Sequence, residues 1–548
     1  MSAYSRRDFL ARSSVALAGV GIGLRPGVLG ALPARSARPV AELLPDLVDA
    51  DTLRKLALAA MDAARGAGAS YADIRIANRR MLDMMYFYHR PDIPPISSLG
   101  FDYSYGVRVR VDGGWAFASG ADPTVDGVAG ATRRAAGRAR DLAKVSGPAP
   151  EFVAAPVVTG EWVTPVKIDP FSVSPDEHAY MLGAYMEATS RALGAETQPS
   201  FYWQSETRVF ASTEGSLVTQ RLAQARPRVT VDAEPNVRRP AHLPVTEIAP
   251  ESAGFEITQG SALQERIKAI AEETTRLLAY PIVSVEVGRY PAVLDGASIG
   301  AILGATLAPA LELDRVLGLT ADTGGTSFLA PPATILGRPM FSPALTVSAD
   351  RTPPHLGAAR WDDEGVATEA FPVIQHGAVV DYFATRGSAA TLVPWYTSRG
   401  MPIRAHGSAV AWMAAKAPVG TASSLLVHAD AAGASLDALT RELGNGLLMR
   451  GVSDAFSDQQ LTSGTLFPAM LFEVKHGQIT RRFAGGAVQF GTAKFWKSLT
   501  TLGDESSVQS YVHEAEVGEG MMQMVQPIRA PAGHVQELNV VQIESRVR

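Results

Sequence analysis

The residues from 290 to 329 read YPAVLDGASIGAILGATLAPALELDRVLGLTADTGGTSFL, and this stretch decides the fold. It opens with the short apolar run PAVL, which predicts a β-strand, and Asp295 and Gly296 turn the chain after it. Residues 297–308 are small or aliphatic and carry no charge, which predicts a buried helix. We expect Pro309 to end or kink this helix, because proline has no backbone N–H for the helical ladder.

Gly300, Gly304 and Ala308 recur at every fourth position of the predicted helix. Residues four apart lie near the same face of a helix, so this face has almost no side-chain volume. We therefore predict that another backbone packs closely against it, either a strand of this chain or a helix of a partner.

Two short motifs follow the predicted helix. Residues 311–314, LELD, have the form L-E-x-D, and residues 325–327 are G-T-S. This stretch resembles the TldD/PmbA family of metallopeptidases and their relatives, whose active TldD-type members carry H-E-x-x-x-H, L-E-x-D and G-T-S in this order. The resemblance extends over roughly residues 57–542 and is weak in places.

The resemblance places Gly304 and Ala305 where active members carry the first His and the Glu, and Pro309 where they carry the second His. None of the three side chains can bind a metal or act as a base. Active members also use a Cys near the C-terminus as a metal ligand, and this chain has no Cys. The resemblance therefore implies a degenerate metal site, with no catalytic residue, no bound metal and no cofactor.

Glu312 and Asp314 of the L-E-x-D motif have two readings. Their carboxylates could hydrogen-bond a metal ligand or bind a substrate amine without touching the metal themselves. With the ligands themselves missing, the favoured reading is a helix end whose carboxylates are solvated or salt-bridged.

The composition excludes several other classes of function. The chain has 548 residues, of which 46% are hydrophobic and 19% are charged, and this is typical of a globular protein of two or three domains. A net charge of −5 gives no reason to expect a nucleic-acid partner. The absence of Cys excludes disulfides and thiolate nucleophiles. The sequence has neither the G-x-S-x-G motif of serine hydrolases nor a phosphate-binding P-loop.

The first 37 residues have the pattern of a twin-arginine export signal. Arg6 and Arg7 stand in the sequence SRRDFL, and a mildly apolar segment at 15–24 follows, too short to span a bilayer. We expect cleavage after Ala34 or Ala37 and a periplasmic location. No later run of about 18 apolar residues occurs, so we expect no membrane span in the mature form.

The expected fold class is α+β, with three modules after the signal. They are an N-terminal α/β module at 38–150, a middle module at 151–279 and an antiparallel, β-rich C-terminal domain at 280–548. The N-terminal module contains a helix at 51–65 and strand patterns such as YADIRI and VRVRV, which are similar to the start of the TldD/PmbA family. Residues 226–245 are polar and contain prolines, which predicts a loop.

The aromatic segment between these strands, residues 81–105, is expected to be an insertion. It contains MYFYH at 85–89 together with Phe101, Tyr103 and Tyr105. Exposed aromatic side chains at this density would form a surface for a partner or a peptide. A pair of buried strands explains them equally well, and both interpretations stay open.

Other polar residues of the C-terminal domain have simpler explanations. Asp362, Asp363 and Glu364 lack the spacing of a calcium loop, so a turn with polar caps is expected. His376 and His476 each precede a glycine between two strand patterns, which predicts exposed hairpin tips. No two of the ten histidines have the spacing of a helical zinc site.

These observations predict an exported pseudoenzyme of the TldD/PmbA type. It would bind unfolded peptide inside an assembly with a TldD-type sister subunit as a heterodimer, or with itself as a homodimer, while the sister supplies the metal. One alternative is an active metallopeptidase with a non-standard metal site, which would bring zinc back as a cofactor. Another is a non-enzymatic envelope scaffold or binding protein.

Overall fold

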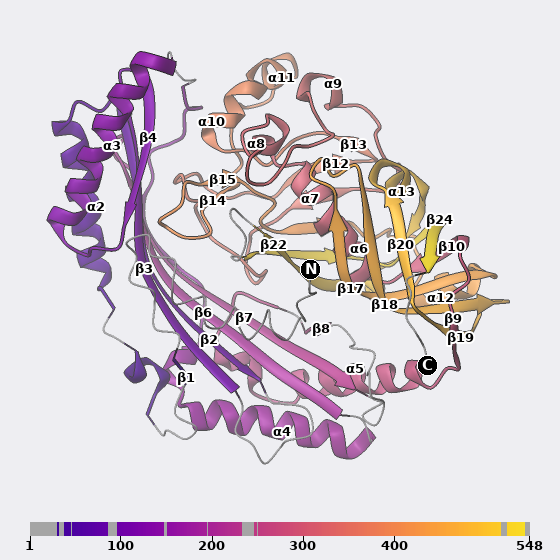
Figure 1. Ribbon diagram of the computed structural model, residues 1–548. Helices are drawn as coiled ribbons and strands as arrows, with labels where there is room; N and C mark the ends of the chain where they lie inside the picture. The colour runs from indigo at the N-terminus through magenta and orange to yellow at the C-terminus, as the bar shows by residue number, and fades with distance from the viewer. Residues whose placement is uncertain are drawn as a thin grey trace, which may run out of the picture.

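In the computed structural model, the described residues are 30–31, 38–44, 47–85, 96–146, 151–193, 196–232, 246–248, 250–516 and 523–542. Figure 1 shows a long curved sheet with its helices on one side and a β-rich domain enclosed by its inner side. Within the described residues, no helix is long and apolar enough to cross a membrane.

The curved sheet is built around four long antiparallel strands in the order β3-β2-β6-β7. Its strands are β1 (Gly30–Ala31), β2 (Tyr71–Met85), β3 (Ile96–Val111), β4 (Gly114–Gly120), β5 (Thr159–Val163), β6 (Glu196–Ser212), β7 (Leu217–Asp232) and β8 (Thr246–Glu247). The helices that cover it are α2 (Ala50–Gly66), α3 (Val125–Ser146), α4 (Pro175–Leu193) and α5 (Ala262–Leu278). Strands that precede residue 150 and strands that follow it belong to this one sheet. The predicted boundary between the N-terminal and middle modules therefore falls within one structural layer.

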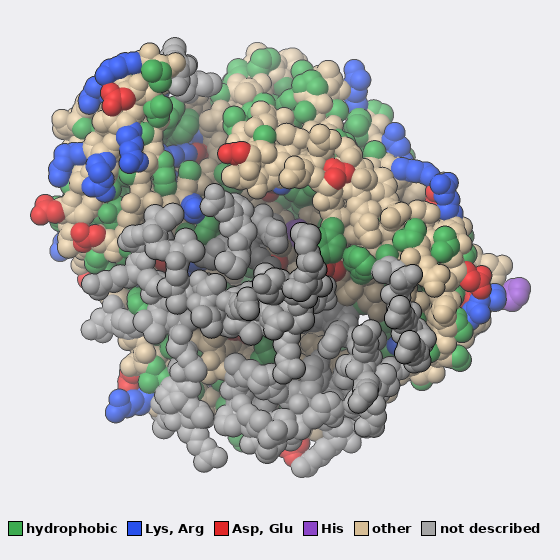
Figure 2. Space-filling view, in the orientation of Figure 1, with side chains coloured by type: hydrophobic (Ala, Val, Ile, Leu, Met, Phe, Trp, Pro, Cys, Tyr) green, Lys and Arg blue, Asp and Glu red, His purple; other side chains and the backbone are tan. Residues whose placement is uncertain are grey.

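Successive side chains of β2 alternate between the two faces of this sheet, and their contacts show what each face packs against. Ile74 and Ile76 pack into the cluster under α2 and α3, and Leu82 and Met84 pack into the cluster under α4 and α5. Successive side chains of a strand point to opposite faces, so the residues between them face the C-terminal domain. Arg75 shows this, because its guanidinium donates to a carbonyl of that domain, the Asp363 oxygen, at 3.2 Å. The outer surface over α2 and α3 carries Lys and Arg side chains (Figure 2).

The structure favours one of the two open interpretations of the aromatic segment and corrects the start of a predicted loop. The aromatic segment forms the far halves of β2 and β3, where Leu99 and Tyr105 are buried, which favours the interpretation as buried strands over an aromatic surface. Its residues 86–95 lie outside the described part of the chain. The loop predicted at 226–245 is also wrong at its start, because β7 continues to Asp232. Pairing with β6 along the whole of β7 outweighs the local polar composition.

The C-terminal domain contains two further sheets. In one, the pairings β10–β17, β17–β18, β18–β20, β20–β24 and β24–β10 close a ring. Its strands are β9 (Ile282–Ser284), β10 (Gly288–Leu294), β17 (Gly446–Ser457), β18 (Ser463–Lys475), β19 (Gln478–Ala484), β20 (Gly486–Gly491), β21 (Leu499–Leu502) and β24 (Gly533–Gln542). The other has the order β13-β12-β11-β16-β23-β22. Its strands are β11 (Val347–Ala349), β12 (Phe371–Gln375), β13 (Ala378–Val379), β16 (Leu425–Val427), β22 (Gln509–Glu516) and β23 (Gln523–Ala530).

Short elements fill the space around these sheets. The helices are α6 (Gly296–Ala305), α7 (Leu307–Ala310), α8 (Leu313–Val316), α9 (Pro332–Ile335), α10 (Arg386–Ala389), α11 (Val393–Ser398), α12 (Leu436–Glu442) and α13 (Thr492–Ser498). A separate ribbon pairs β14 (Ala409–Val410) with β15 (Val419–Gly420). Helix α6 packs against β17 of the closed sheet and against β22 and β23 of the open one, so it lies between the two sheets.

Candidate functional site

Helix α6 carries Gly304 and Ala305, two of the three positions predicted to be degenerate, and its first turn is fixed by Asp295. The Asp295 carboxylate accepts from the Ser298 backbone N–H at 2.9 Å, which caps the helix. It also accepts from the Arg450 guanidinium at 3.1 Å, which ties the helix start to β17. The predicted turn at Asp295 is therefore an N-cap buried between a strand and a helix.

The end of α6 differs from the prediction. The helix stops at Ala305, and Pro309 lies in the first turn of the next helix, α7, where a missing N–H costs nothing. Proline at 309 leaves the Ala305 carbonyl without its helical donor. The Ser457 hydroxyl donates to that carbonyl at 2.6 Å, so β17 supplies the bond that proline cannot.

The glycine face of α6 is covered by strand β22. A Cβ added at Gly300 would lie 3.0 Å from the Tyr511 Cβ, and one added at Gly304 would lie 2.6 Å from the His513 Cγ. Four helical residues rise about 6 Å and two strand residues about 6.8 Å, so alternate residues of β22 meet successive glycines. The approaching backbone predicted from the glycine spacing is thus a strand of the same chain.

His513 is the residue that replaces the missing side chain at position 304. Burial lowers the pKa of its imidazole to about 4, so it is neutral at physiological pH. In the β22–β23 pairing, His513 lies opposite Gln526, whose amide donates to the Glu312 carboxylate at 3.4 Å. His513 beside Gly304 is therefore linked through Gln526 to Glu312.

Glu312 and Asp314 lie at the start of α8, as the favoured interpretation expected, but Asp314 is buried and Glu312 is only partly exposed. Burial raises the pKa of Glu312 to about 7. Asp314 is buried, and its carboxylate accepts from the Gly420 backbone N–H at 2.7 Å. The backbone around Glu312 pairs with the segment at Phe383, where Leu313 donates to the Phe383 carbonyl.

The zinc of active TldD-type proteins does not fit these residues. Gly304, Ala305 and Pro309 supply no ligand atom from a side chain, and the ring of His513 fills the space in front of Gly304. Across the described residues, no group of three or more His, Asp or Glu side chains is arranged to hold a metal ion.

Residues 362–364 form the expected turn with polar caps, and their carboxylates are buried. Each of Asp362, Asp363 and Glu364 is only 2% exposed. Asp362 accepts from backbone N–H groups of its own turn, and its pKa is raised to about 7 by burial and by the charge of Glu364. The turn packs against the inner face of the curved sheet and does not face water.

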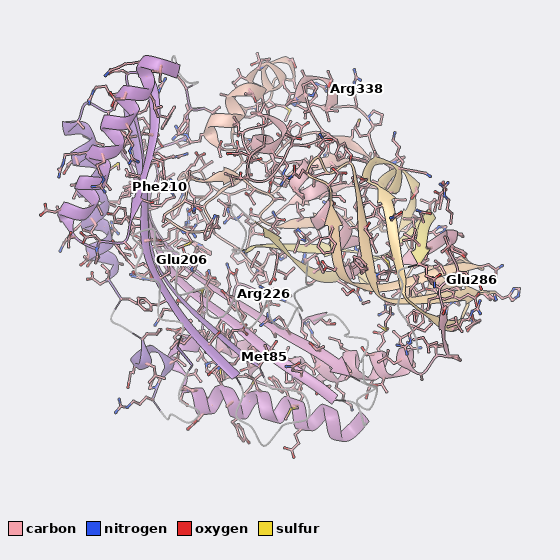
Figure 3. The ribbon with its side chains drawn as sticks, viewed as in Figure 1. Met85, Glu206, Phe210, Arg226, Glu286 and Arg338 are labelled. Carbon is pink, nitrogen blue, oxygen red and sulfur yellow. The ribbon has the colours of Figure 1, made fainter. Side chains whose placement is uncertain are left out.

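Arginines of the curved sheet neutralise these carboxylates. Arg108 on β3 bonds Asp73 on β2 and pairs with Glu364 at 2.7 Å. Arg208 on β6 bonds Asp363. Buried charges are stable only when they are paired, so this cluster fixes the curved sheet against the C-terminal domain. Figure 3 shows the same inner face with Glu206, Phe210 and Arg226 labelled, and Arg226 reaches Glu514 of β22 at 3.0 Å.

The two histidine turns lie where they were predicted. His376 and His476 are exposed between paired strands, and each has a positive φ, followed by a glycine that also has one. Two successive residues in this conformation form the tight turn that suits the twist of a hairpin. Arg6 and Arg7 lie outside the described residues.

A cavity of about 610 Å³ opens close to the end of α6. It lies where β17, β18, β20 and β24 of the closed sheet meet α13, and its lining includes Ser457 and the aromatic side chains of Phe456, Phe490 and Phe495. Phe456 is 55% exposed. The rim carries Lys494, which pairs with Glu537 at 2.6 Å. A cavity of this size and mixed lining can hold a small ligand or the side chains of a peptide.

Residues 287–542 match the model of the PmbA/TldA metallopeptidase C-terminal domain. The C-terminal domain of this chain is that of the TldD/PmbA family. This domain contains α6, the glycine face and the cavity. The family and the α+β fold predicted from the sequence are both confirmed.

Solved structures of similar fold agree with this assignment. TldE from Thermococcus kodakarensis aligns with a TM-score of 0.63 at 15% identity, covering 89% of this chain and 100% of that one. A candidate modulator of a DNA gyrase from Thermotoga maritima aligns with a TM-score of 0.65 at 15% identity over the same shares of the two chains. A candidate modulator of DNA gyrase from Bacteroides thetaiotaomicron reaches 0.62 at 15% identity, covering 91% of this chain and 100% of that one. No curated protein matches the sequence significantly.

Sequence reasoning missed His513 because nothing near it in the sequence marks it. It is one of ten scattered histidines, and only the packing of β22 on α6 brings it to Gly304. The alternation of β22 together with the glycine spacing could have suggested that a strand residue fills each gap. It could not have selected β22 among the many strands of the domain.

Proposed function

We propose that this chain is a non-catalytic, peptide-handling subunit of a metallopeptidase assembly, in which a TldD-type sister chain supplies the metal. The observation that carries the proposal is the contact between His513 and Gly304. The place of the first metal-binding histidine is taken by a ring from β22 whose own pKa is lowered to about 4 by burial.

The remaining polar groups at the site support a binding role. A hydrolytic metal site needs about three protein ligands and an open position for water. His513 and Glu312 are two candidate donors, and Gln526 already bonds Glu312. These three side chains could orient a substrate for the reaction that the partner catalyses. Orientation alone contributes much of the rate of an enzyme.

The cavity lined by Phe456, Phe490 and Phe495 supports the peptide part of the proposal. Aromatic side chains give large contact area with little loss of conformational entropy. The polar residues that line the same cavity, among them Ser457 and Asn539, can bond a peptide backbone without selecting a sequence. An unfolded peptide offers side chains for the aromatic contacts and a free backbone for the polar ones, and successive residues of it would enter this cavity.

The experiment compares the chain alone with the chain purified together with a TldD-type protein encoded beside it. Alone, it should contain no stoichiometric zinc and should cleave no unfolded peptide. Together, the pair should cleave, and Phe456→Ser in this chain should raise KM for peptide. Leu319→Ser is the matched control, since Leu319 is 67% exposed and does not line the cavity.

One result would replace the proposal by the active alternative. If the isolated chain holds one zinc, cleaves peptide in a chelator-sensitive way, and loses both properties in His513→Ala, then it is a metallopeptidase with a non-standard site. If no TldD-type partner binds and no peptide is retained by the isolated chain, the scaffold alternative is favoured. Export is also part of the proposal, and it rests on Arg6 and Arg7.

A further inference from the structure

His406 lies between two carboxylates in the core of the C-terminal domain. Its Nδ1 is 2.6 Å from a Glu369 oxygen, and its Nε2 is 2.9 Å from an Asp381 oxygen. The side chain is almost completely buried and stacks on the Phe371 ring, with 4.0 Å between the centroids. Neither the family motif nor the proposed site uses this residue.

Carboxylates at hydrogen-bond distance from both ring nitrogens favour a protonated imidazole. A neutral imidazole has one N–H and one lone pair, so it can donate to only one of the two carboxylates. The lone pair on its other nitrogen would then face a lone pair of the second carboxylate at hydrogen-bond distance, and the two would repel each other. An imidazolium donates from both nitrogens, and each such bond is a charge-assisted one.

The other titratable and charged groups at this cluster leave the charge balanced. Tyr396 donates its hydroxyl to Asp381 at 2.8 Å, and Arg404 pairs with Glu369 at 3.1 Å. With His406 protonated, two cations face two anions. Loss of its proton leaves a net negative charge, most of it shielded from water, and removes one of the two hydrogen bonds.

His406 joins two segments that support the candidate site. Asp381 is two residues before Phe383, whose backbone accepts from Leu313 and donates to Leu311 around Glu312. His406 itself precedes Ala409 and Ala411, whose backbone N–H groups donate to Asp362 at 3.0 Å and to Asp363 at 2.7 Å. The same imidazole therefore connects the backbone beside the L-E-x-D motif with the backbone that donates hydrogen bonds to the buried carboxylates.

We propose that His406 is a pH-sensitive clamp: protonated, it holds residues 381–384 and 405–411 together, and its deprotonation loosens both segments. The consequence for the protein is that the backbone around Glu312 becomes more mobile in alkaline solution. The clamp does not depend on whether the chain is catalytic, so it stands apart from the proposed function.

The sign of the pH dependence follows from the partners of His406. Burial lowers the pKa of the imidazole, but the hydrogen bonds to Asp381 and Glu369 outweigh burial and raise the pKa above the ordinary 6.5. The clamp is therefore fully formed below about pH 6.5 and is lost as the pH rises through the raised value. Glu312 and Asp362 also titrate near pH 7, so a global stability curve would mix three groups and a local measurement is needed.

The test is hydrogen exchange of the full-length protein between pH 6 and 9, corrected for the intrinsic exchange rate. Protection of 381–384 and 405–411 should fall about tenfold across this range, as expected for the loss of one charge-assisted hydrogen bond. His406→Gln should show low protection in both segments at every pH. Asp381→Asn should move the transition to lower pH, because a single carboxylate raises the pKa of the imidazole less.

The control is His428→Gln, since His428 is an exposed histidine that bonds Ser348 at 2.8 Å and should leave the profile unchanged. A titration of the His406 ring followed by NMR in the unmodified protein keeps the test independent of any variant. A His406 that loses its proton at or below pH 6.5 would overturn the proposal. So would local protection that does not change with pH, or that changes equally in His406→Gln.

Discussion

Replacing Gly304 by alanine tests the packing of β22 on α6. The added Cβ would lie 2.6 Å from the Cγ and 2.7 Å from the Cβ of His513, which is far inside van der Waals contact. Alanine is better than glycine in a helix by about 0.5–1 kcal/mol, and overpacking costs about 1–3 kcal/mol. Because one of the two clashing atoms is a Cβ fixed to the β22 backbone, we expect a net destabilisation of about 2 kcal/mol.

Two glycines provide matched comparisons for this variant. At Gly300 the added Cβ would meet the Tyr511 Cβ at 3.0 Å, a milder contact, so Gly300→Ala should be nearly neutral. At Gly137 in α3 nothing lies within 4 Å, so Gly137→Ala should stabilise by about 0.5–1 kcal/mol. Hydrogen exchange in urea measures the local free energy of unfolding, followed at residues 296–311 for the two α6 variants and at residues 125–146 for Gly137→Ala.

Second-site changes separate the two clashing atoms. His513→Ala removes the ring but keeps the Cβ at 2.7 Å, so it should rescue Gly304→Ala only in part. His513→Gly removes both atoms and should give a favourable coupling energy of about 1–3 kcal/mol in a double-mutant cycle. If Gly304→Ala is as stable as the parent, or if neither second change couples to it, then β22 does not pack on α6 as described and the reasoning fails.

Three further outcomes are expected. Glu312→Gln should flatten the fall in stability between pH 5 and 8, because a carboxyl with a pKa raised to about 7 contributes stability at low pH that is lost as the pH rises through that value; urea denaturation at several pH values measures this. Arg108→Met should cost about 3–5 kcal/mol, because it leaves Glu364 buried without its salt bridge and leaves Asp73 paired only with Arg75, whereas Lys144→Met, which removes an exposed pair with Asp141, should change thermal stability little. Replacing Arg6 and Arg7 by lysine should keep the protein in the cytoplasm, and fractionation that still finds the double variant exported would disprove the signal assignment.

Several features of the site followed from local sequence alone. The run of small residues after Asp295 predicted a buried helix with one face open to a close neighbour, and such a helix forms with β22 against that face. The glycines after His376 and His476 predicted hairpin tips, because positive φ at successive positions is a local property of the backbone. The L-E-x-D and G-T-S motifs gave the family before any packing was known.

The errors share one cause. The sequence predicted the turn at residues 362–364 but not its burial, because Glu364 pairs with Arg108, which lies 256 positions earlier. The predicted solvation of Asp314 failed for the same reason, since its partner Gly420 comes from a distant strand, as does Gln526, which bonds Glu312. Whether a carboxylate is exposed depends on what is brought to it, and composition within a short window carries no information about that.

The sequence by itself determined which backbone conformations were possible and where close approach was allowed, because helix periodicity, turn glycines and proline act over a few residues. It also determined that positions 304, 305 and 309 provide no metal ligand. Only the tertiary structure decided that β22 is the strand that approaches, that His513 fills the gap at Gly304, and that His406 lies between Glu369 and Asp381. These contacts join residues far apart in the chain, and their choice depends on the simultaneous pairing of strands in all three sheets.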